Sequence, residues 1–264
     1  MTRPIFFLTD FGLQDTYVGI VKAVMLGITP EAQIVDLTHE IPPQDVRAGA
    51  YALMTAAPYL PTDAVVLAVV DPGVGTARRP IAVQASGRIY VGPDNGLLSW
   101  AVDGLLSVYV LDRPAFWLPN VSSTFHGRDL FGPAAAHLAR GVSLAEVGTR
   151  AASMQTIPFP AAHRVLDDEG QVVRAEAEVI HVDRYGNLIV SLTAADLPPE
   201  PVVEVAGRRI VGLAAHFQDR PDADDELLAL IGSAGLLEIT VPNGSAAAEL
   251  AVGVGARVII TRRG

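Results

Sequence analysis

The sequence contains no cysteine, which excludes disulfide bridges, thiolate nucleophiles and cysteine metal sites together. Basic residues are also scarce: 19 Lys and Arg stand against 29 Asp and Glu, and the net charge at pH 7 is −10. A charge of this sign repels a phosphate backbone unless basic side chains gather on one face, and no stretch of the sequence gathers them. We therefore expect no nucleic-acid partner.

Long apolar runs are missing as well. Residues 5–8 are the only apolar run before Thr9, which is too short for the core of a secretory signal. No uninterrupted apolar run elsewhere approaches the length of a membrane span. We expect a soluble, cytoplasmic protein with no membrane partner. Half of the 264 residues are hydrophobic, so the chain can still build a substantial core.

The first half of the sequence alternates short apolar strands with helical periodicity. The expected elements, in chain order, are a strand at 5–8, a helix at 17–28, a strand at 34–37, a helix at 45–57 and a strand at 64–70. Asp15 is the expected N-cap of the first helix, and Pro30 ends it. This order implies a parallel sheet with right-handed crossovers. A hairpin over 81–91 and helices at 97–102 and 130–139 are expected to follow.

The pattern changes after about residue 150. Pro158, Pro160 and the polar segment 166–170 indicate a linker. Beyond it, strands without long helices between them are expected at 178–192, 202–211, 236–241 and 256–261. We therefore predict two domains: an α/β domain over 1–160, with a mainly parallel sheet and flanking helices, and a smaller, mostly antiparallel β domain over 171–264.

Two carboxylates follow strands of the predicted parallel sheet. Asp10 comes after the first strand and Asp71 after the third. Ligands of open parallel sheets bind beyond the carboxyl ends of the strands, so both carboxylates are candidates for one crevice. Taken singly, each has a simpler interpretation as a turn or helix-capping residue, and the neighbouring Arg78 and Arg79 as a solvated pair of charges on a loop.

Two further segments carry polar groups suited to chemistry. His126 precedes a glycine and an expected helix start, where exposed N–H groups and a near-neutral pKa favour proton chemistry, although a surface or packing histidine is an alternative. Asp183, Tyr185 and Asn187 combine a carboxylate, an aromatic face and an amide. The amide could read a purine edge while the ring stacks on the base, but Tyr-Gly-Asn would also make a tight hairpin turn.

Several familiar motifs are missing from the sequence. The pair of glycines at 73 and 75 lacks the third glycine of the dinucleotide fingerprint. The phosphate-loop pattern, a His-Glu-x-x-His helix and the Gly-x-Ser-x-Gly elbow are also absent. These absences weaken the nucleotide-phosphate, zinc-protease and α/β-hydrolase interpretations.

Seven segments, in order along nearly the whole chain, closely resemble the S-adenosyl-L-methionine hydroxide adenosyltransferase family, whose relatives include fluorinating and chlorinating enzymes. The segments are TDFGLQD (9–15), IPPQDVRAGA (41–50), VDPGVGTARRP (70–80), GPDNGLL (92–98), TFHGRDLFGPAAA (124–136), DRYGNL (183–188) and GSAGLLEI (232–239). The combination is highly specific. The resemblance implies an N-terminal α/β domain, a β-barrel-like C-terminal domain and a homotrimer with active sites between subunits.

The resemblance also implies roles for individual residues. In hydrolytic members an Asp, an Arg and a His act on water, and the matching residues here are Asp71, Arg78 and His126; halogenating members lack them. The implied substrate contacts are Asp10 to both ribose hydroxyls, Asp183 to the methionine ammonium, Tyr185 near adenine, Asn187 reading adenine and Ser233 to the substrate carboxylate. Ala234 and Gln44 stand where the fluorinating relatives have Arg and Trp, so those parts of the pocket should differ.

The predicted reaction is hydrolysis of S-adenosyl-L-methionine to adenosine and methionine, by attack of an activated water on C5′ of the adenosyl group. The sulfonium is already an activated leaving group, so no metal, other cofactor or general acid is needed to expel methionine. Asp71 and Arg78 would hold the water and favour its deprotonation.

Three alternatives remain open at this point. A halogenase would use the same cleft but would need an apolar, dehydrated halide pocket, against which Asp71 and Arg78 argue. A non-catalytic protein would bind S-adenosyl-L-methionine or adenosine without turnover. A metal-dependent phosphoesterase would use Asp10, Asp15, Asp71 and His39, although nothing in the sequence fixes their ligand geometry.

Overall fold

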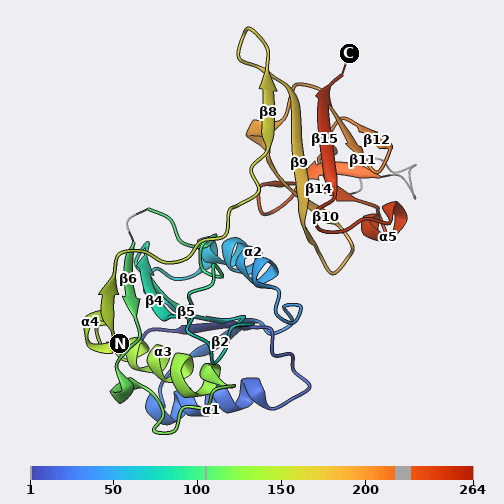
Figure 1. The fold of residues 1–264 in the computed structure, drawn as a ribbon. Coiled ribbons are helices and arrows are strands. Elements are labelled where there is room, and N and C mark those ends of the chain that lie inside the picture. The colour runs from blue at the N-terminus through green and yellow to red at the C-terminus, as the bar shows by residue number, and fades with distance from the viewer. Residues whose placement is uncertain (1, 105, 218–226, 264) are drawn as a thin grey trace. The chain divides into compact units, whose positions relative to one another are not determined.

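The chain folds into two compact units, Met1–Ile157 and Pro158–Gly264. The computed structural model in Figure 1 describes residues 2–104, 106–217 and 227–263. The first unit is an α/β layer structure and the second is built almost entirely of strands.

The first unit contains a seven-stranded sheet in the order β2-β1-β3-β5-β4-β6-β7. Its strands are β1 (Ile5–Thr9), β2 (Ile34–Thr38), β3 (Val65–Val69), β4 (Pro80–Ala85), β5 (Arg88–Pro93), β6 (Ser107–Val110) and β7 (Thr149–Ala151). Its helices are α1 (Tyr17–Ile28), α2 (Val46–Ala56), α3 (Gly132–Ala139) and α4 (Leu144–Val147), with short helical turns η1 (Ala57–Tyr59), η2 (Pro114–Phe116) and η3 (Gly127–Phe131).

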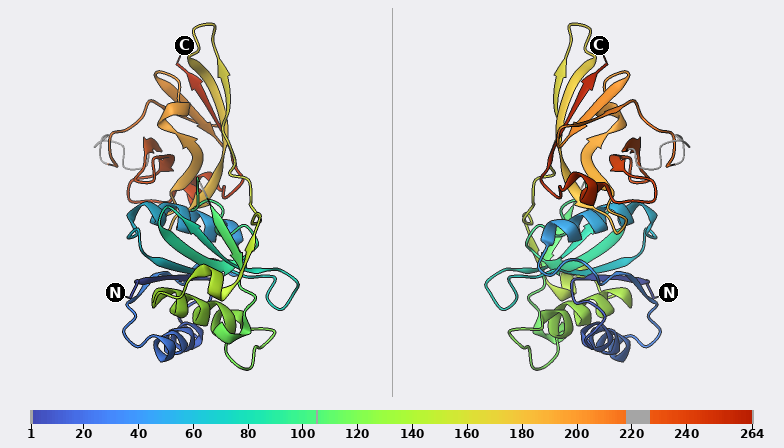
Figure 2. Two further views of the ribbon diagram at one scale, coloured as in Figure 1. Left: turned by 90° about the vertical axis from the view of Figure 1, so that its left-hand side faces the viewer. Right: turned by 90° about the vertical axis from the view of Figure 1, so that its right-hand side faces the viewer.

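Helices cover both faces of this sheet. In β3, Val65, Leu67 and Val69 belong to the core that includes α1 and α3, whereas Val66 and Ala68 belong to the core that includes α2. All five residues of the strand are buried. This two-sided burial explains the unbroken apolar run, because successive side chains of a strand point to opposite faces. Figure 2 shows α1 and α3 on one side of the sheet and α2 on the other.

The sheet is mixed, which corrects the expectation of a mainly parallel sheet. The three pairs β1–β2, β1–β3 and β3–β5 are parallel, whereas β4–β5, β4–β6 and β6–β7 are antiparallel. The predicted βαβαβ order and the 81–91 hairpin are both present. The hairpin joins the sheet through its second strand, β5, so β4 runs opposite to β1, β3 and β5, and the strand direction continues to alternate through β6 and β7.

Two local predictions in this unit are wrong. The N-cap of α1 is Thr16 rather than Asp15. Residues 97–102 form turns and not a helix. In that segment the amide of Ser99 bonds to the carbonyl of Gly96 at 3.0 Å, and Leu97 and Leu98 are both buried. The amide of Leu97 also donates to the side chain of Asn95 at 3.1 Å, and the hydroxyl of Ser99 donates to the carbonyl of Gly96 at 2.7 Å, so local side-chain bonds hold this segment in turns.

The second unit is an all-antiparallel, eight-stranded sheet. The strands are β8 (His163–Leu166), β9 (Val172–Val182), β10 (Leu188–Thr193), β11 (Pro201–Val205), β12 (Arg208–Val211), β13 (Leu228–Ile231), β14 (Leu236–Thr240) and β15 (Arg257–Arg262). Their order is β12-β11-β15-β9-β10-β14-β13, and β8 pairs with β9. The short helical segments are η4 (Ala194–Asp196) and α5 (Ala246–Leu250).

One core lies inside this curved sheet and gives it a barrel-like form. Strand β9 pairs with β15 through Glu178 and with β10 from Val179 onward, so it belongs to both halves of the sheet. Side chains from both halves, including Val203, Leu237 and Ile260, pack in a single cluster. The expected barrel-like, all-β unit is therefore present.

Two turns of this unit lie where a continuous strand and a linker were expected from the sequence. The expected strand 178–192 is a hairpin, β9–β10, with its turn at 183–187. The polar segment 166–170, expected to be a linker, forms the turn of hairpin β8–β9, in which the amides of Glu169 and Gln171 bond to the Asp167 side chain at 3.1 and 2.8 Å. A short polar turn and a linker have the same composition, so the sequence pattern could not separate them.

Candidate active site

The first group of candidate residues follows two neighbouring parallel strands. Thr9 of β1 is in register with Val69 of β3. Asp10 and Asp71 therefore follow strands that end at the same edge of the sheet, where ligands of parallel sheets bind. The amide side chain of Asn95 donates to the carbonyl of Val70 at 2.9 Å and anchors the chain just before Asp71.

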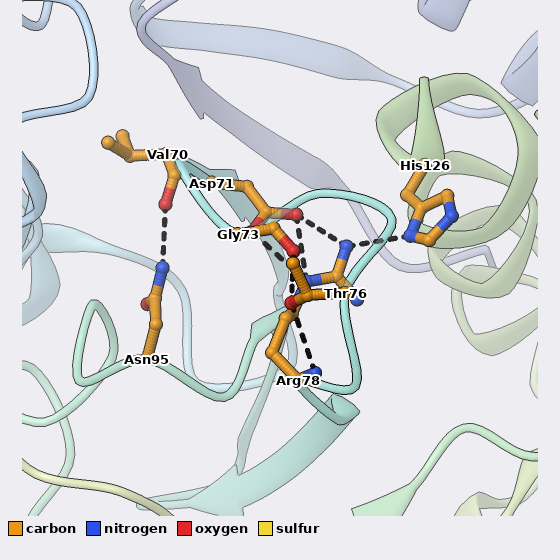
Figure 3. Close-up of polar contacts among 7 residues, drawn as sticks. All are labelled: Val70, Asp71, Gly73, Thr76, Arg78, Asn95 and His126. Carbon is orange, nitrogen blue, oxygen red and sulfur yellow. Dashed lines mark hydrogen bonds and ion pairs between the residues drawn. The ribbon is translucent and has the colours of Figure 1, made fainter. Parts of the chain in front are cut away.

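A tight loop returns the chain from Asp71 to Arg78. The amide of Val74 bonds to the carbonyl of Asp71 at 3.2 Å, and the hydroxyl of Thr76 donates to the carbonyl of Gly73 at 2.7 Å (Figure 3). Gly75 has a φ of +78°, and a Cβ there would lie 2.3 Å from the carbonyl oxygen of Ser123. Only glycine permits this contact, which packs the loop against the segment that leads to His126.

Arg78 is the centre of a three-residue cluster (Figure 3). Its Nε donates to both carboxylate oxygens of Asp71 at 3.0 and 2.9 Å, and its Nη2 donates to Oδ2 at 2.5 Å. The same Nη2 lies 2.7 Å from Nδ1 of His126. The side chains of Arg78 and Asp71 are only 9% and 5% exposed. The guanidinium also lies 5.0 Å from the centre of the Phe131 ring, which shields it from water.

These contacts fix the protonation of His126. A guanidinium can only donate hydrogen bonds, so Nδ1 must accept and the proton of the neutral ring is on Nε2. Burial lowers the pKa of His126, and the charge of Arg78 lowers it further, while Asp71 and Asp129 oppose the shift. The site at neutral pH thus combines a carboxylate, a guanidinium and a neutral imidazole.

Arg79, the next residue, belongs to a different pair. It donates to the carboxylate of Asp94 through Nε at 2.8 Å and Nη2 at 2.5 Å, and to the carbonyl of Ser153 at 2.9 Å. The amide of Gln155 donates to the other oxygen of Asp94 at 2.6 Å. Arg79 therefore ties the start of β4 to the end of the first unit, while Arg78 faces the cluster.

A second buried carboxylate shapes the loop before His126. Asp129 is fully buried, and it accepts from the amide of Ser122 at 2.8 Å and from Arg128 at 2.6 Å. These bonds hold residues 122–128 in place, so His126 reaches Arg78 from a fixed loop. No sequence pattern had indicated a function for Asp129.

Asp10 lies in a separately braced loop. Its Oδ2 accepts from the amide of Gln44 at 2.8 Å, and Gln44 has a φ of +67°, which is unusual for a residue with a side chain. The preceding Thr9 is buried and hydrogen-bonds through its hydroxyl to Nδ1 of His39 at 2.8 Å. His39 thus fixes the position of Thr9, the residue that precedes Asp10.

The second group of candidate residues lines one pocket of the second unit. Asp183, Tyr185, Asn187 and Ser233 surround a cavity of about 650 Å³. The remaining lining residues are Phe217, Glu238, Thr240, Val241, Pro242, Asn243 and Gly244. Tyr185 and Phe217 are 76% and 48% exposed, which leaves two aromatic surfaces open to a ligand.

The 183–187 hairpin turn is organised by Asp183. Its Oδ1 accepts from the amides of Tyr185 and Asn187 at 2.8 and 2.9 Å, and its Oδ2 accepts from Nδ2 of Asn187 at 2.8 Å. Gly186 has a φ of +82°, and a Cβ there would lie 2.0 Å from the hydroxyl of Ser245. The turn therefore packs directly against the start of α5. Because Asn187 donates through Nδ2 to Asp183, its amide oxygen stays available as an acceptor.

Comparison with known proteins identifies the family. The N-terminal domain model of the SAM hydroxide adenosyltransferases matches residues 5–148, and the C-terminal domain model matches residues 177–259. The chain belongs to this family. It is 48% identical to a Thermus thermophilus protein named (R)-S-adenosyl-L-methionine hydrolase, over 92% of this chain and 94% of that one. It is 28% identical to a Nocardia brasiliensis fluorinase, over 74% of this chain and 73% of that one.

A solved structure shares the fold. The crystal structure of an uncharacterized conserved protein from Thermotoga maritima matches with a TM-score of 0.85 and 36% identity, and covers 98% of this chain and 100% of that chain. The structure of this family member places Asp71 and His126 in direct contact with Arg78. Four further residues expected in the site, Asp183, Tyr185, Asn187 and Ser233, line one pocket.

Seven lining residues of this pocket were not expected from the sequence, among them Phe217 and Glu238. Glu238 had a detectable signal, since it is the one charged residue in the strand sequence LLEIT. Phe217 had none, because it lies in a loop without a recognisable pattern.

The described ranges contain no helix long and apolar enough to cross a membrane. They also contain no group of three His, Asp or Glu side chains arranged to hold a metal, so the four residues of the phosphoesterase alternative do not form such a site.

Proposed function

We propose that this protein hydrolyses S-adenosyl-L-methionine to adenosine and L-methionine. The contact of Asp71 and His126 with one buried guanidinium carries the proposal, because it places a carboxylate and a fixed cation where a water can be activated. Membership in the SAM hydroxide adenosyltransferase family and the name of the Thermus relative support it.

In the proposed reaction, the water oxygen attacks C5′ while the bond between C5′ and sulfur breaks. The bonding pair stays on sulfur, so the sulfonium becomes the neutral thioether of methionine. The water loses one proton, which Asp71 accepts before it passes to solvent. Arg78 stabilises the hydroxide-like oxygen that develops during the attack, and the neutral ring of His126 holds Arg78 in position through Nδ1.

The substrate-binding roles follow the division of residues between the two units. Asp10 receives the ribose hydroxyls through its carboxylate, for which the Gln44 amide fixes the orientation. Asn187 reads the adenine edge through its free amide oxygen, Tyr185 lies against the base, and Ser233 contacts the substrate carboxylate. Asp183 contacts the substrate ammonium and also orients Asn187.

We further propose a homotrimer in which each active site takes Asp10, Asp71, Arg78 and His126 from one subunit and the pocket of the second unit from a neighbour. A cyclic trimer with heterologous interfaces allows this arrangement. The second unit's pocket holds groups suited to adenine and methionine but no counterpart of the Asp71 cluster among its lining residues.

The deciding experiment is chromatography of the products after incubation with S-adenosyl-L-methionine. We expect equal amounts of adenosine and methionine, and we expect Asp71→Asn to lower the rate by roughly a hundredfold or more while binding survives. The relatives' name specifies the R configuration at sulfur, so the two sulfur epimers are assayed separately. If Asp71→Asn turns over at the wild-type rate, the assigned water-activating role is wrong. Stoichiometric binding without methionine release would favour the non-catalytic alternative.

Mixing two inactive variants tests the shared site. Asp71→Asn damages only the first group of residues and Asn187→Ala only the second, so co-refolded trimers contain some sites with both groups intact. Activity that appears only in the mixture supports sites between subunits. If mixed trimers form, as shown by mass spectrometry of differently tagged chains, and no activity returns, each site lies within one chain.

A further inference from the structure

The carboxylate of Asp183 is largely occupied by its own turn. It accepts three hydrogen bonds from Tyr185 and Asn187, at 2.8, 2.9 and 2.8 Å. A carboxylate offers about four acceptor positions, so roughly one remains for a ligand. An α-ammonium group has three N–H donors. Asp183 alone therefore cannot satisfy the ammonium group that the proposed function assigns to it.

Glu238 supplies a second carboxylate in the same pocket. It lies on β14 between Leu237 and Ile239, whose side chains are in the core, so the alternation of the strand turns Glu238 away from the core. Glu238 and Thr240 both line the pocket that contains Asp183. No side chain or backbone group of the described residues makes a hydrogen bond or ion pair with its carboxylate.

The backbone makes room for this carboxylate. A Cβ on Gly232 would lie 1.7 Å from Oε1 of Glu238 and 2.1 Å from its Cδ. The carboxylate therefore lies directly over Gly232, beside the pocket residue Ser233. Burial raises the pKa of Glu238, and the negative charge of Asp183 raises it further. A partly buried carboxylate next to another one is costly unless a cation compensates both.

We propose that Glu238 and Asp183 together bind the α-ammonium group of the substrate, and that Glu238 makes the enzyme selective for sulfonium nucleosides that carry this amino group. The inference rests on the proposed hydrolysis of S-adenosyl-L-methionine and adds a specificity-determining residue to it. The ammonium donates one hydrogen bond to the remaining acceptor position of Asp183 and the others to Glu238, whose carboxylate has no partner among the residues that the structure describes. The substrate's positive charge compensates the two neighbouring carboxylates.

The test compares Glu238→Gln with wild type on two substrates. One is S-adenosyl-L-methionine, and the other is the sulfonium analogue in which hydrogen replaces the α-amino group. Glutamine keeps the shape and one acceptor oxygen but removes the charge. We expect KM for S-adenosyl-L-methionine to rise about tenfold or more, kcat to stay within about twofold, and KM for the deaminated analogue to change less than twofold.

Two further variants are matched to this one. Glu238→Asp keeps the charge on a shorter side chain, and we expect a smaller rise in KM than with glutamine. Glu204→Gln removes an exposed carboxylate of the same unit that pairs with Arg209 at 3.2 Å outside this pocket, and we expect no change with either substrate. If Glu238→Gln leaves KM for S-adenosyl-L-methionine within twofold, or raises KM for both substrates equally, the ammonium assignment is wrong.

Glu238→Gln also distinguishes the ammonium assignment from the alternative in which Glu238 binds the substrate carboxylate. If a protonated Glu238 instead donated to the substrate carboxylate, the glutamine amide would replace it as a donor and affinity would be kept. Calorimetric titration of both ligands into wild type and Glu238→Gln measures the same selectivity without turnover. Selective loss of S-adenosyl-L-methionine affinity in a protein that releases no adenosine would support the ammonium site and refute hydrolysis, whereas hydrolysis with unchanged selectivity would refute the ammonium site alone.

Discussion

Replacement of Arg78 by lysine tests whether the forked guanidinium, and not merely its charge, is needed. Arg78 makes three contacts with Asp71 between 2.5 and 3.0 Å and one with His126 at 2.7 Å. A lysine ammonium is a single nitrogen and cannot reproduce the planar fork that reaches both partners. We expect it to keep one contact with Asp71 and to lose the contact with Nδ1 of His126.

The size of the effect follows from these bonds. Three N–H groups of the guanidinium, one on Nε and two on Nη2, make these contacts, and the lysine ammonium replaces one of them. Hydrogen bonds to charged groups contribute about 1.5–3 kcal/mol each, so the net loss of two should lower the free energy of unfolding by about 3–6 kcal/mol. Because a lysine ammonium held by a single contact is not fixed beside the oxygen that develops negative charge in the transition state, kcat should fall about a hundredfold, which corresponds to about 2.7 kcal/mol. KM should change little, since Arg78 is assigned no role in binding the substrate.

Arg79→Lys is the matched control. It breaks the same kind of fork, on the buried carboxylate of Asp94, but in a side chain that is 42% exposed and outside the cluster. Asp94 keeps its bond from the amide of Gln155. We expect a smaller loss of stability, about 1–2 kcal/mol, and kcat within twofold of wild type. Urea unfolding and product chromatography measure the two quantities. If Arg78→Lys keeps kcat within threefold, or if Arg79→Lys lowers kcat equally, the reasoning about the cluster fails.

Three other predictions concern the same site. Burial and the charge of Arg78 lower the pKa of His126 below its usual 6.5, so the unfolded chain takes up a proton before the folded one as pH falls. The free energy of unfolding should therefore decline below about pH 6.5. Urea titrations across this pH range should show a smaller decline for His126→Gln. Activity should be unchanged in excess chelator, since the proposed reaction uses no metal, and a loss restored by added metal would contradict it. High chloride or fluoride should yield adenosine and no halogenated nucleoside, whereas chromatographic detection of a halogenated product would favour a halogenase.

The first unit was largely predictable because its signals are periodic and local. The helix expected at 17–28 is present as α1, and Val21 and Met25 of its apolar spacing are buried, although Tyr17 and Ile20 are exposed. The apolar run 64–70 favours a strand, and β3 is buried along its whole length. The helix expected at 45–57 is present as α2, which Asp45 caps by accepting from the amide of Ala48 at 2.9 Å. Each of these features depends on residues that are close together in the sequence.

The parts that were not predicted depend on contacts between distant residues. No local sequence pattern indicates which strand of the β4–β5 hairpin pairs with β3. The pairing of β5 with β3 leaves β4 antiparallel to its neighbours and makes the sheet mixed. The contact of Arg78 with His126 spans 48 residues and was expected only from the family resemblance. Glu238 was overlooked because Asp183, the other carboxylate of the pocket, lies in the 183–187 turn, and the two residues line one pocket only once the sheet has formed.

The distribution of charge between the two groups of residues fits the direction of the proposed reaction. The guanidinium of Arg78 lies beside the proposed base Asp71, where negative charge develops on the attacking oxygen, and the carboxylates of Asp183 and Glu238 lie in the pocket assigned to the amino-acid end. The substrate enters with two positive charges, the ammonium and the sulfonium, and the sulfonium charge disappears as C5′ leaves sulfur. Methionine then presents one cation to the two carboxylates, so its attraction to the pocket weakens after the reaction. An arrangement that favours the substrate, with its two cationic groups, over methionine, with one, promotes both capture and release, without any group that protonates the leaving sulfur.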